Sequence, residues 1–439
     1  LTPHLHHAHH DTARLTAAVY RTGLHLHRNT SPGKRRQLLA LDAARAGARH
    51  LHRDLTRRIP AGTWAPVWAT GSTFNPALRD TLTGHTDTVV AVACTMLDGR
   101  PVAVTGSRDN TVRVWDLTTG RPIGEPLTGH AGDAQAVACT MLDDRPVAVT
   151  GGWDQMVRVW DLTAGRPIGE PLTGHTDVVA AVACTMLDDR PVAVTGSRDD
   201  TVRVWDLTTG RPIGKPLTDH TDVVAAVACT MLDDRPVAVT GSRDHTVRVW
   251  DLTTGRPIGE LPIGYVAAVA CTMLDDRPVA VTGDWDKMVR VWDLTTGRPI
   301  GEPLTGHTDV VAAVACTMLD DRPVAVTGSW DHTVRVWDLT TGRPIGEPLT
   351  GHTGHTGHTG DVVAMACTML DDRPVAVAGS RDGTVRIWDL ITRRPVAEFL
   401  TDNPRSVAFS SSGDLVIGFH NDVAVYRRQP QPQRSRRTS

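Results

Sequence analysis

Histidine, threonine and aspartate recur along this chain at one fixed spacing, and together these side chains could do chemistry. In one copy, Thr195 follows His175 by 20 residues and Asp199 follows it by 24. A hydroxyl, an imidazole and a carboxylate are the parts of a nucleophilic catalytic triad. The trio occurs in five copies, however, and a tryptophan follows each aspartate by six residues. Repeated polar networks of this kind specify a fold, so we interpret the trios as structural.

Two histidine-rich segments could bind a metal ion. The first is His4 to His10, and the second is the run of Gly-His-Thr triplets from Gly351 to Thr359. The first lacks cysteine or carboxylate partners at metal-ligand spacing. In the second, His358 keeps the register of the repeat, and we interpret the other two histidines as extra residues of an expanded loop. We predict no metal site and, without a Walker loop, a Rossmann glycine pattern or an HExxH motif, no cofactor and no enzyme.

The trios lie within a repeated unit of about 45 residues whose pattern predicts four short strands. In the third unit the strands are expected at Val178–Thr185, Val192–Thr195, Thr201–Trp205 and Arg211–Leu217. Turn residues such as Asp-Asp and Thr-Thr-Gly separate them. One sheet of four strands cannot bury both of its faces alone, so the units must stack on one another.

The third strand of each unit ends in Trp-Asp. The seven tryptophans are separated by 45, 45, 45, 42, 45 and 51 residues, and they are Trp115, Trp160, Trp205, Trp250, Trp292, Trp337 and Trp388. With Gly-His upstream, this period resembles the WD-repeat β-propeller family. The resemblance covers residues 78–428 and implies an all-β ring of four-stranded blades.

Beyond the seventh Trp-Asp, residues 406–426 contain three more apolar segments that resemble a degenerate eighth blade without a fourth strand. Near the other end, Arg79 to Thr83 resembles the fourth-strand segment of the regular units. We therefore expect Asp80–Thr83 to complete the eighth blade, because an open sheet edge invites aggregation. Eight blades are favoured, and seven blades are the alternative.

The resemblance also implies a hydrogen-bonded tetrad in each blade: a His before the first strand, a Thr on the second, an Asp in the next turn and the Trp. Two units depart from it. The fifth has Asp286 but no His, and the seventh has His358 and Asp382 but Ala378 in place of Thr. We expect these two blades to be less stable. The five complete tetrads are His85, Thr105, Asp109 and Trp115; His130, Thr150, Asp154 and Trp160; His175, Thr195, Asp199 and Trp205; His220, Thr240, Asp244 and Trp250; and His307, Thr327, Asp331 and Trp337.

One turn varies between units that are otherwise nearly identical. The resemblance implies that this turn lies on the top face of the ring, beside the central channel, where partners bind. Trp and Arg, the residues found there, are enriched in binding hot spots. The alternative is that each Arg only pairs with a neighbouring acid. The predicted partner-binding residues are Arg108, Trp153, Arg198, Arg243, Trp285, Trp330 and Arg381, together with Tyr265 and Gln135.

We also predict how these residues are grouped. Blades five and six are adjacent, so Trp285 and Trp330 are expected to be neighbours, joined by Tyr265. Blades three and four are expected to place Arg198 beside Arg243.

Outside the ring, the sequence predicts a basic α-helical segment over residues 1–60, with 11 basic and 3 acidic side chains. Apolar residues at helical spacing indicate helices over Leu15–Leu26 and Leu38–Leu55, as a hairpin. Residues 61–77 are expected to be a linker, and residues 429–439 a disordered basic tail. The seven cysteines, one on the first strand of each unit, are expected to be free thiols, which favours a reducing, cytoplasmic compartment.

We predict a non-catalytic scaffold that binds a protein or peptide on its top face. One alternative is the ligand-sensing C-terminal domain of a bacterial signal-transducing NTPase, since the chain begins within a helical segment without a Met. A second is nucleic-acid binding through the basic ends, which is disfavoured because arginine there lacks interleaved aromatic residues. The chain has no apolar run near the ~20 residues that span a bilayer, so no membrane partner is expected.

Overall fold

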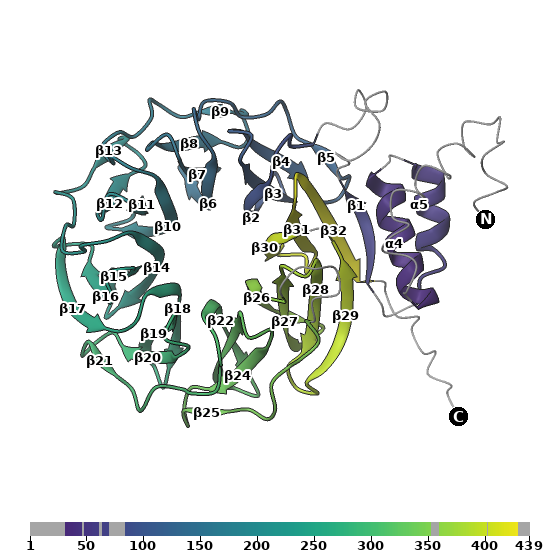
Figure 1. Cartoon of the computed structure of the whole chain (residues 1–439). Coiled ribbons are helices and arrows are strands. Elements are labelled where there is room, and N and C mark those ends of the chain that lie inside the picture. Colours follow the sequence, from purple (N-terminus) through teal and green to yellow (C-terminus); the bar gives the residue numbers. More distant parts are fainter. Residues whose placement is uncertain are drawn as a thin grey trace, which may run out of the picture.

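The structure of this chain is a computed structural model that describes residues 31–45, 48–60, 64–69, 84–352, 360–401 and 403–428. Within these residues, eight four-stranded antiparallel sheets are arranged in a closed ring (Figure 1). The fold is an eight-bladed β-propeller, as the sequence predicts, and the seven-bladed alternative is excluded.

The first four blades follow the repeat closely. Blade one is β2 (Val89–Leu97), β3 (Arg100–Ser107), β4 (Val112–Asp116) and β5 (Arg121–Pro122). Blade two is β6 (Ala134–Leu142), β7 (Arg145–Gly152), β8 (Val157–Asp161) and β9 (Arg166–Pro167). Blade three is β10 (Val179–Leu187), β11 (Arg190–Ser197), β12 (Val202–Asp206) and β13 (Arg211–Pro212). Blade four is β14 (Val224–Leu232), β15 (Arg235–Ser242), β16 (Thr246–Asp251) and β17 (Arg256–Pro262).

The remaining blades complete the circle. Blade five is β18 (Val266–Leu274), β19 (Arg277–Asp284), β20 (Val289–Asp293) and β21 (Arg298–Pro299). Blade six is β22 (Val311–Leu319), β23 (Arg322–Ser329), β24 (Val334–Asp338) and β25 (Arg343–Pro344). Blade seven is β26 (Val362–Leu370), β27 (Arg373–Ser380), β28 (Thr384–Asp389) and β29 (Arg394–Leu400). Blade eight is β30 (Pro404–Phe409), β31 (Leu415–Phe419), β32 (Asp422–Arg428) and β1 (Trp64–Ala69).

The apolar core of the ring lies between blades. Valines 192, 194, 202 and 204 of blade three pack against Val224, Trp250 and Leu252 of blade four, and the same pattern repeats around the ring. Each Trp of a Trp-Asp pair is therefore buried against the preceding blade, and Trp250 is 1% exposed. Since a fully buried large apolar side chain stabilises by roughly 1.5–3 kcal/mol, each blade depends on its neighbours.

The ring is closed by a sheet built from both ends of the chain. β1 pairs with β32, with Trp64 opposite Arg428 and Ala69 opposite Ala424. The prediction that Asp80–Thr83 supplies this strand was wrong, and those residues lie outside the described part of the chain. Residues 61–77 were interpreted as a linker, yet they contain β1. The physical reason is burial, because Trp64 lies fully buried, 6.1 Å edge-on from the Phe399 ring.

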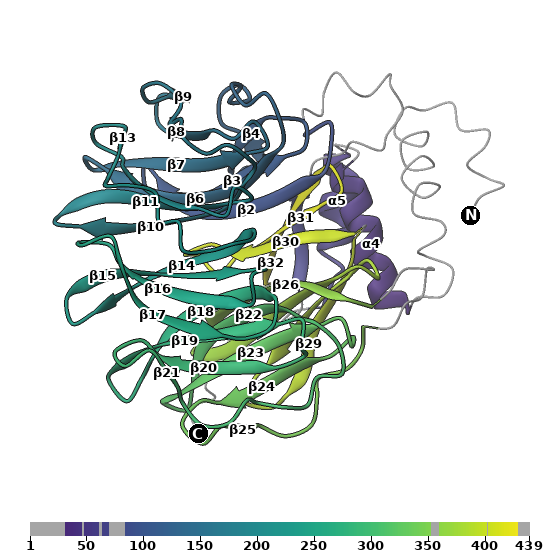
Figure 2. The same cartoon turned by 60° about the vertical axis from the view of Figure 1, so that its left-hand side comes forward.

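Two helices lie against the outer side of this closing sheet (Figures 1 and 2). They are α4 (Pro32–Arg45) and α5 (Arg49–Thr56), so two helices stand where the sequence indicated a single one over Leu38–Leu55. The helix expected over Leu15–Leu26 lies outside the described residues. Gln37 Nε2 donates to the Trp64 carbonyl at 2.8 Å, and Lys34 pairs with Glu398 of blade seven at 2.7 Å. The helical pair is thus fixed to blades seven and eight.

We predict that β1, rather than residues 79–83, closes the ring. A variant that begins at residue 62 and one that begins at residue 71 both lack α4 and α5, but only the second lacks β1. We expect the second variant to show the lower melting temperature and to aggregate, because β32 becomes an exposed edge. Size-exclusion chromatography and thermal melts make the comparison. Two monomers with the same melting temperature would contradict closure by β1.

Candidate functional site

The five complete tetrads are formed as predicted, and they hold the turns of one face in place. In blade three, His175 Nδ1 lies 2.9 Å from the Asp199 carboxylate and its Nε2 lies 2.8 Å from Thr195 Oγ1. Trp205 Nε1 donates to the same hydroxyl at 2.9 Å. If His175 donates its Nδ1–H to Asp199, its Nε2 accepts the hydrogen bond from the Thr195 hydroxyl. Each ring nitrogen of His175 and Trp205 and the Thr195 hydroxyl then has a hydrogen-bond partner within the tetrad. Distances in the other four tetrads agree within 0.2 Å.

These contacts fix the protonation of the aspartate. Burial alone would raise the pKa of Asp199, but hydrogen bonds from His175, Thr176 and Thr201 hold it well below the ordinary value. The carboxylate is therefore charged and fully engaged, and the threonine hydroxyl beside it is buried. A catalytic nucleophile must reach its substrate. The geometry thus supports the structural interpretation of the trios.

Blade seven corrects one sequence assignment. His352, which we had interpreted as an extra residue, is 1% exposed, and its Nδ1 lies 2.7 Å from Thr384 Oγ1 and 3.7 Å from Asp382. His352 therefore takes the tetrad position, and His358 lies outside the described residues. With Ala378 on the second strand, the Nε2 of His352 has no hydrogen-bond partner among the described residues.

Blade five has lost its histidine and gained a buried carboxylate. Asp284 is fully buried at a position where five other units have Ser, and it pairs with Arg290 and accepts the Met288 amide at 2.9 Å. Burial, followed by the nearby charge of Asp286, raises the pKa of Asp284 despite these partners. Trp292 still donates to Thr282 at 3.0 Å, so the apolar side of the blade is intact.

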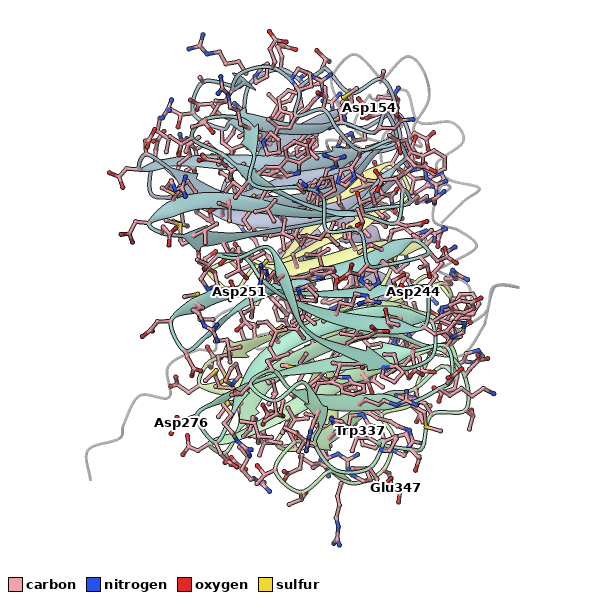
Figure 3. All side chains as sticks on the ribbon, turned by 90° about the vertical axis from the view of Figure 1, so that its left-hand side faces the viewer. Asp154, Asp244, Asp251, Asp276, Trp337 and Glu347 are labelled. Carbon is pink, nitrogen blue, oxygen red and sulfur yellow. The ribbon has the colours of Figure 1, made fainter. Side chains whose placement is uncertain are left out.

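The two faces of the ring carry different chemistry. In the edge-on view of Figure 3, the tetrad residues Asp154 and Asp244 lie at one edge of the disc, and Asp251 and Asp276 lie at the other. We call the first edge the top face, as the sequence resemblance implies. The opposite, bottom face carries a methionine near the end of the innermost strand in blades one to seven, all of them 41–52% exposed: Met96, Met141, Met186, Met231, Met273, Met318 and Met369.

Five side chains on the top face form one continuous stack, which we call the aromatic ladder: His245, Tyr265, Trp285, Trp330 and Arg381. The ring centroids of His245 and Tyr265 lie 4.1 Å apart, Tyr265 and Trp285 5.7 Å, and Trp285 and Trp330 5.7 Å. The Arg381 guanidinium lies over the Trp330 ring at 5.2 Å, a cation–π distance. The ladder crosses blades four to seven and confirms the expected adjacency of Tyr265, Trp285 and Trp330.

A second, smaller cluster lies on blades two and three. Trp153 is 46% exposed, donates to Gln135 Oε1 at 3.2 Å and lies under the Arg198 guanidinium at 5.0 Å. Arg198 thus stacks on blade two, and no contact with Arg243, its expected neighbour, is seen among the described residues. Arg108 approaches Asp133 at 3.7 Å, and Arg381 pairs with Asp361 at 3.1 Å. These two arginines therefore do pair with a neighbouring acid, as the alternative interpretation expects.

Sequence reasoning missed His245 as a member of the ladder. The signal was present, since His245 follows the tetrad aspartate in the same turn as Arg243 and has a left-handed backbone, φ 66°. That conformation turns its ring towards blade five, where the three-residue deletion places Tyr265. The contribution of His245 depends on this neighbour and could not be read from its own unit.

The cysteines provide no further functional site. All seven cysteines are free, and burial raises the pKa of Cys94, Cys184, Cys271 and Cys316 to about 12, so these thiols are protonated at neutral pH. Among the residues that the structure describes, no helix is long and apolar enough to cross a bilayer, and no group of His, Cys, Asp or Glu could hold a metal ion.

We predict that Asp284→Ser stabilises the protein at neutral pH. The unfolded Asp has an ordinary pKa of about 3.9, and folding raises it. The folded state therefore holds a disfavoured charge at pH 7, and this cost disappears as the pH falls below the unfolded pKa. The variant should melt at a higher temperature at pH 7, with a gain that shrinks towards pH 4. The reciprocal change Ser329→Asp should lower the melting temperature, and an equal gain at both pH values would refute the charge as the cause.

Comparison with known proteins agrees with this geometry. No curated protein matches the chain in sequence. Among solved structures, the chain is similar to the computationally designed protein Ika8, with 26% identity, a TM-score of 0.62, and a match that covers 79% of this chain and 98% of the designed one. The model of the WD40 family (WD domain, G-beta repeat) matches residues 77–116, 120–161, 165–206, 210–251, 256–293, 297–338 and 346–389. These seven segments make up more than half of the sequence, and the chain belongs to the WD40-repeat family.

Proposed function

We propose that this protein is a non-catalytic scaffold that binds a peptide or protein segment across the aromatic ladder of its top face. WD40 propellers are typically protein-interaction scaffolds, and the ladder is the observation that supports a particular surface here. Trp285 is 46% exposed and Tyr265 37% exposed, and they lie edge to face in one continuous surface. Exposed aromatic side chains that form a contiguous patch mark interaction sites more often than single ones do.

The ladder is held rigidly, which favours binding. Four of the five side chains directly precede or follow the aspartate of the tetrad position, and the fifth, Tyr265, accepts the Trp285 amide through its carbonyl at 2.9 Å. The Trp330 amide donates to the Val310 carbonyl at the same distance. The rings also contact one another across blade boundaries. Side chains that are already ordered lose little entropy when a partner binds, so more of the contact energy appears as affinity. The surface suits apolar or aromatic side chains of an extended segment.

We expect Trp285→Ala together with Trp330→Ala to weaken partner binding by about 2 kcal/mol or more, the loss typical of hot-spot aromatics. A random linear peptide library is first selected on the intact protein, and the enriched peptides are then titrated into the variant by calorimetry. Because both side chains lie in surface turns, the melting temperature should change little.

The matched control is Met273→Ala with Met318→Ala, which removes two exposed apolar side chains from the same two blades at the bottom face. It should leave the affinity unchanged. If the tryptophan variant binds every selected peptide normally, or both variants lose affinity equally, the ladder is not the binding surface.

One observation favours a second candidate, a sensor domain that reports ligand binding to an upstream NTPase. The helical pair α4–α5 is fixed to the closing sheet by the Lys34–Glu398 ion pair and by Leu41, which packs with Trp64 and Tyr426. A change in blades seven and eight would reach these helices directly. Such coupling requires a ligand that binds one arrangement better than the other. Amide exchange in α4 and β1 that is identical with and without a selected peptide would argue against the sensor role.

A further inference from the structure

Blade eight differs from every other blade in the top-face turn between its second and third strands. Its turn between β31 and β32 consists of His420 and Asn421 alone, whereas blade one has Arg108 to Thr111 between β3 and β4. Blade eight therefore places no Trp or Arg at the turn position that supplies the ladder in other blades.

An arginine on the innermost strand stands at this gap. Arg405 is the second residue of β30 and lies within the register shift that all innermost strands share. Gln135 holds the same position in blade two, where it reaches the top face to bind Trp153. The position therefore lies at the top-face end of the innermost strand. Elsewhere it is small or apolar: Val90, Ala180, Ala225, Ala267, Ala312 and Val363.

Arg405 has no compensating acid among the residues that the structure describes. Among the described residues it donates no hydrogen bond and forms no ion pair, and its Nε is buried without a partner. Burial, followed by the positive charges of Arg381 and Arg108, lowers the pKa of Arg405. Those two flanking arginines each approach an aspartate, Asp361 at 3.1 Å and Asp133 at 3.7 Å. A partly buried charge between two like charges destabilises the fold.

Further donors near this point are also unsatisfied. Arg381 lies over Trp330, the ladder ring closest to blade eight in chain order, and both Arg381 Nε and Trp330 Nε1 are buried without a hydrogen-bond partner. Since buried polar groups are normally paired, these donors at the end of the aromatic surface are available to an acceptor that a partner supplies.

We propose that Arg405, flanked by Arg381 and Arg108, binds a carboxylate of the partner that lies on the aromatic ladder, an inference that rests on the proposed function. A guanidinium binds a carboxylate through two parallel hydrogen bonds, and the flanking positive charges attract the same group. The partner is thus an acidic peptide segment that carries an apolar or aromatic side chain for the ladder and an Asp, a Glu or a C-terminal carboxylate for Arg405.

The test compares libraries and variants. A random linear peptide library is selected in parallel on the intact protein and on Arg405→Gln. The peptides enriched on the intact protein are synthesised with free and with amidated C-termini, and with each acidic residue changed to its amide, which separates a side-chain carboxylate from a terminal one. Arg405→Lys keeps the charge but lacks the planar fork. Arg256→Gln, an exposed arginine on the outer strand β17 of blade four, is the matched control.

We expect the intact protein to enrich acidic residues beside an aromatic one, and Arg405→Gln to lose the acidic preference while keeping the aromatic preference. Removing either the carboxylate or the Arg405 guanidinium should weaken binding about 10- to 100-fold. Removing both should add little further, because they are one interaction. Arg405→Lys should recover part of the affinity, and Arg256→Gln should leave the affinity unchanged. The melting temperature of Arg405→Gln should be unchanged or higher.

Peptides that depend on Trp285 and Trp330 but show no acidic preference, or that bind Arg405→Gln as tightly as the intact protein, would overturn the carboxylate site and leave the proposed function standing. Peptides that bind the double tryptophan variant normally would overturn the proposed function itself.

Discussion

The structure depends on packing between neighbouring blades. Each four-stranded sheet has an apolar side on both of its faces, and the large clusters of buried residues that build the ring join one blade to the next. A blade is therefore stable only between two neighbours, and the last blade must meet the first. The composite sheet of β30, β31, β32 and β1 meets this requirement, with Val416, Val423 and Val425 packed against Trp115 of blade one.

On this frame, the polar tetrads fix the turns of the top face, and the side chains that differ between units lie in those turns. Blade five shows how the two layers are linked. It lacks the tetrad histidine and holds a buried carboxylate at Asp284, yet it contributes Tyr265 and Trp285 to the centre of the ladder. Ring contacts with His245 on one side and Trp330 on the other hold these residues, so an incomplete tetrad lies beneath the centre of the ladder.

Much of this could be predicted from the sequence because the repeat supplies its own comparison. Trp205 and Asp199 recur at fixed spacing, so strands, tetrads and the top turn followed from one unit. Prediction failed where a segment had no equivalent in the other repeats, or where two residues fitted the same repeat position. The strand β1 lies outside the repeat, and its assignment depends on the burial of Trp64 against Phe399 of blade seven. His352 and His358 are equivalent in local sequence, and the contacts of His352 with Thr384 and Asp382 were needed to identify it as the tetrad histidine. Arg405 belongs to the degenerate blade, where the register of β30 was needed to align it with Gln135.

The register of the closing sheet has a mechanical consequence. Trp64, the first residue of β1, lies opposite Arg428, the last residue of β32. The N-terminal and C-terminal segments therefore leave this pair of strands at the same end. Tension that pulls the two chain ends apart would load the hydrogen bonds one pair at a time, as in unzipping, rather than all together in shear. The ring would therefore open at its seam under a low force. The α4 helix bears on this seam, since Leu41 and Gln37 both contact Trp64 and would have to release it first.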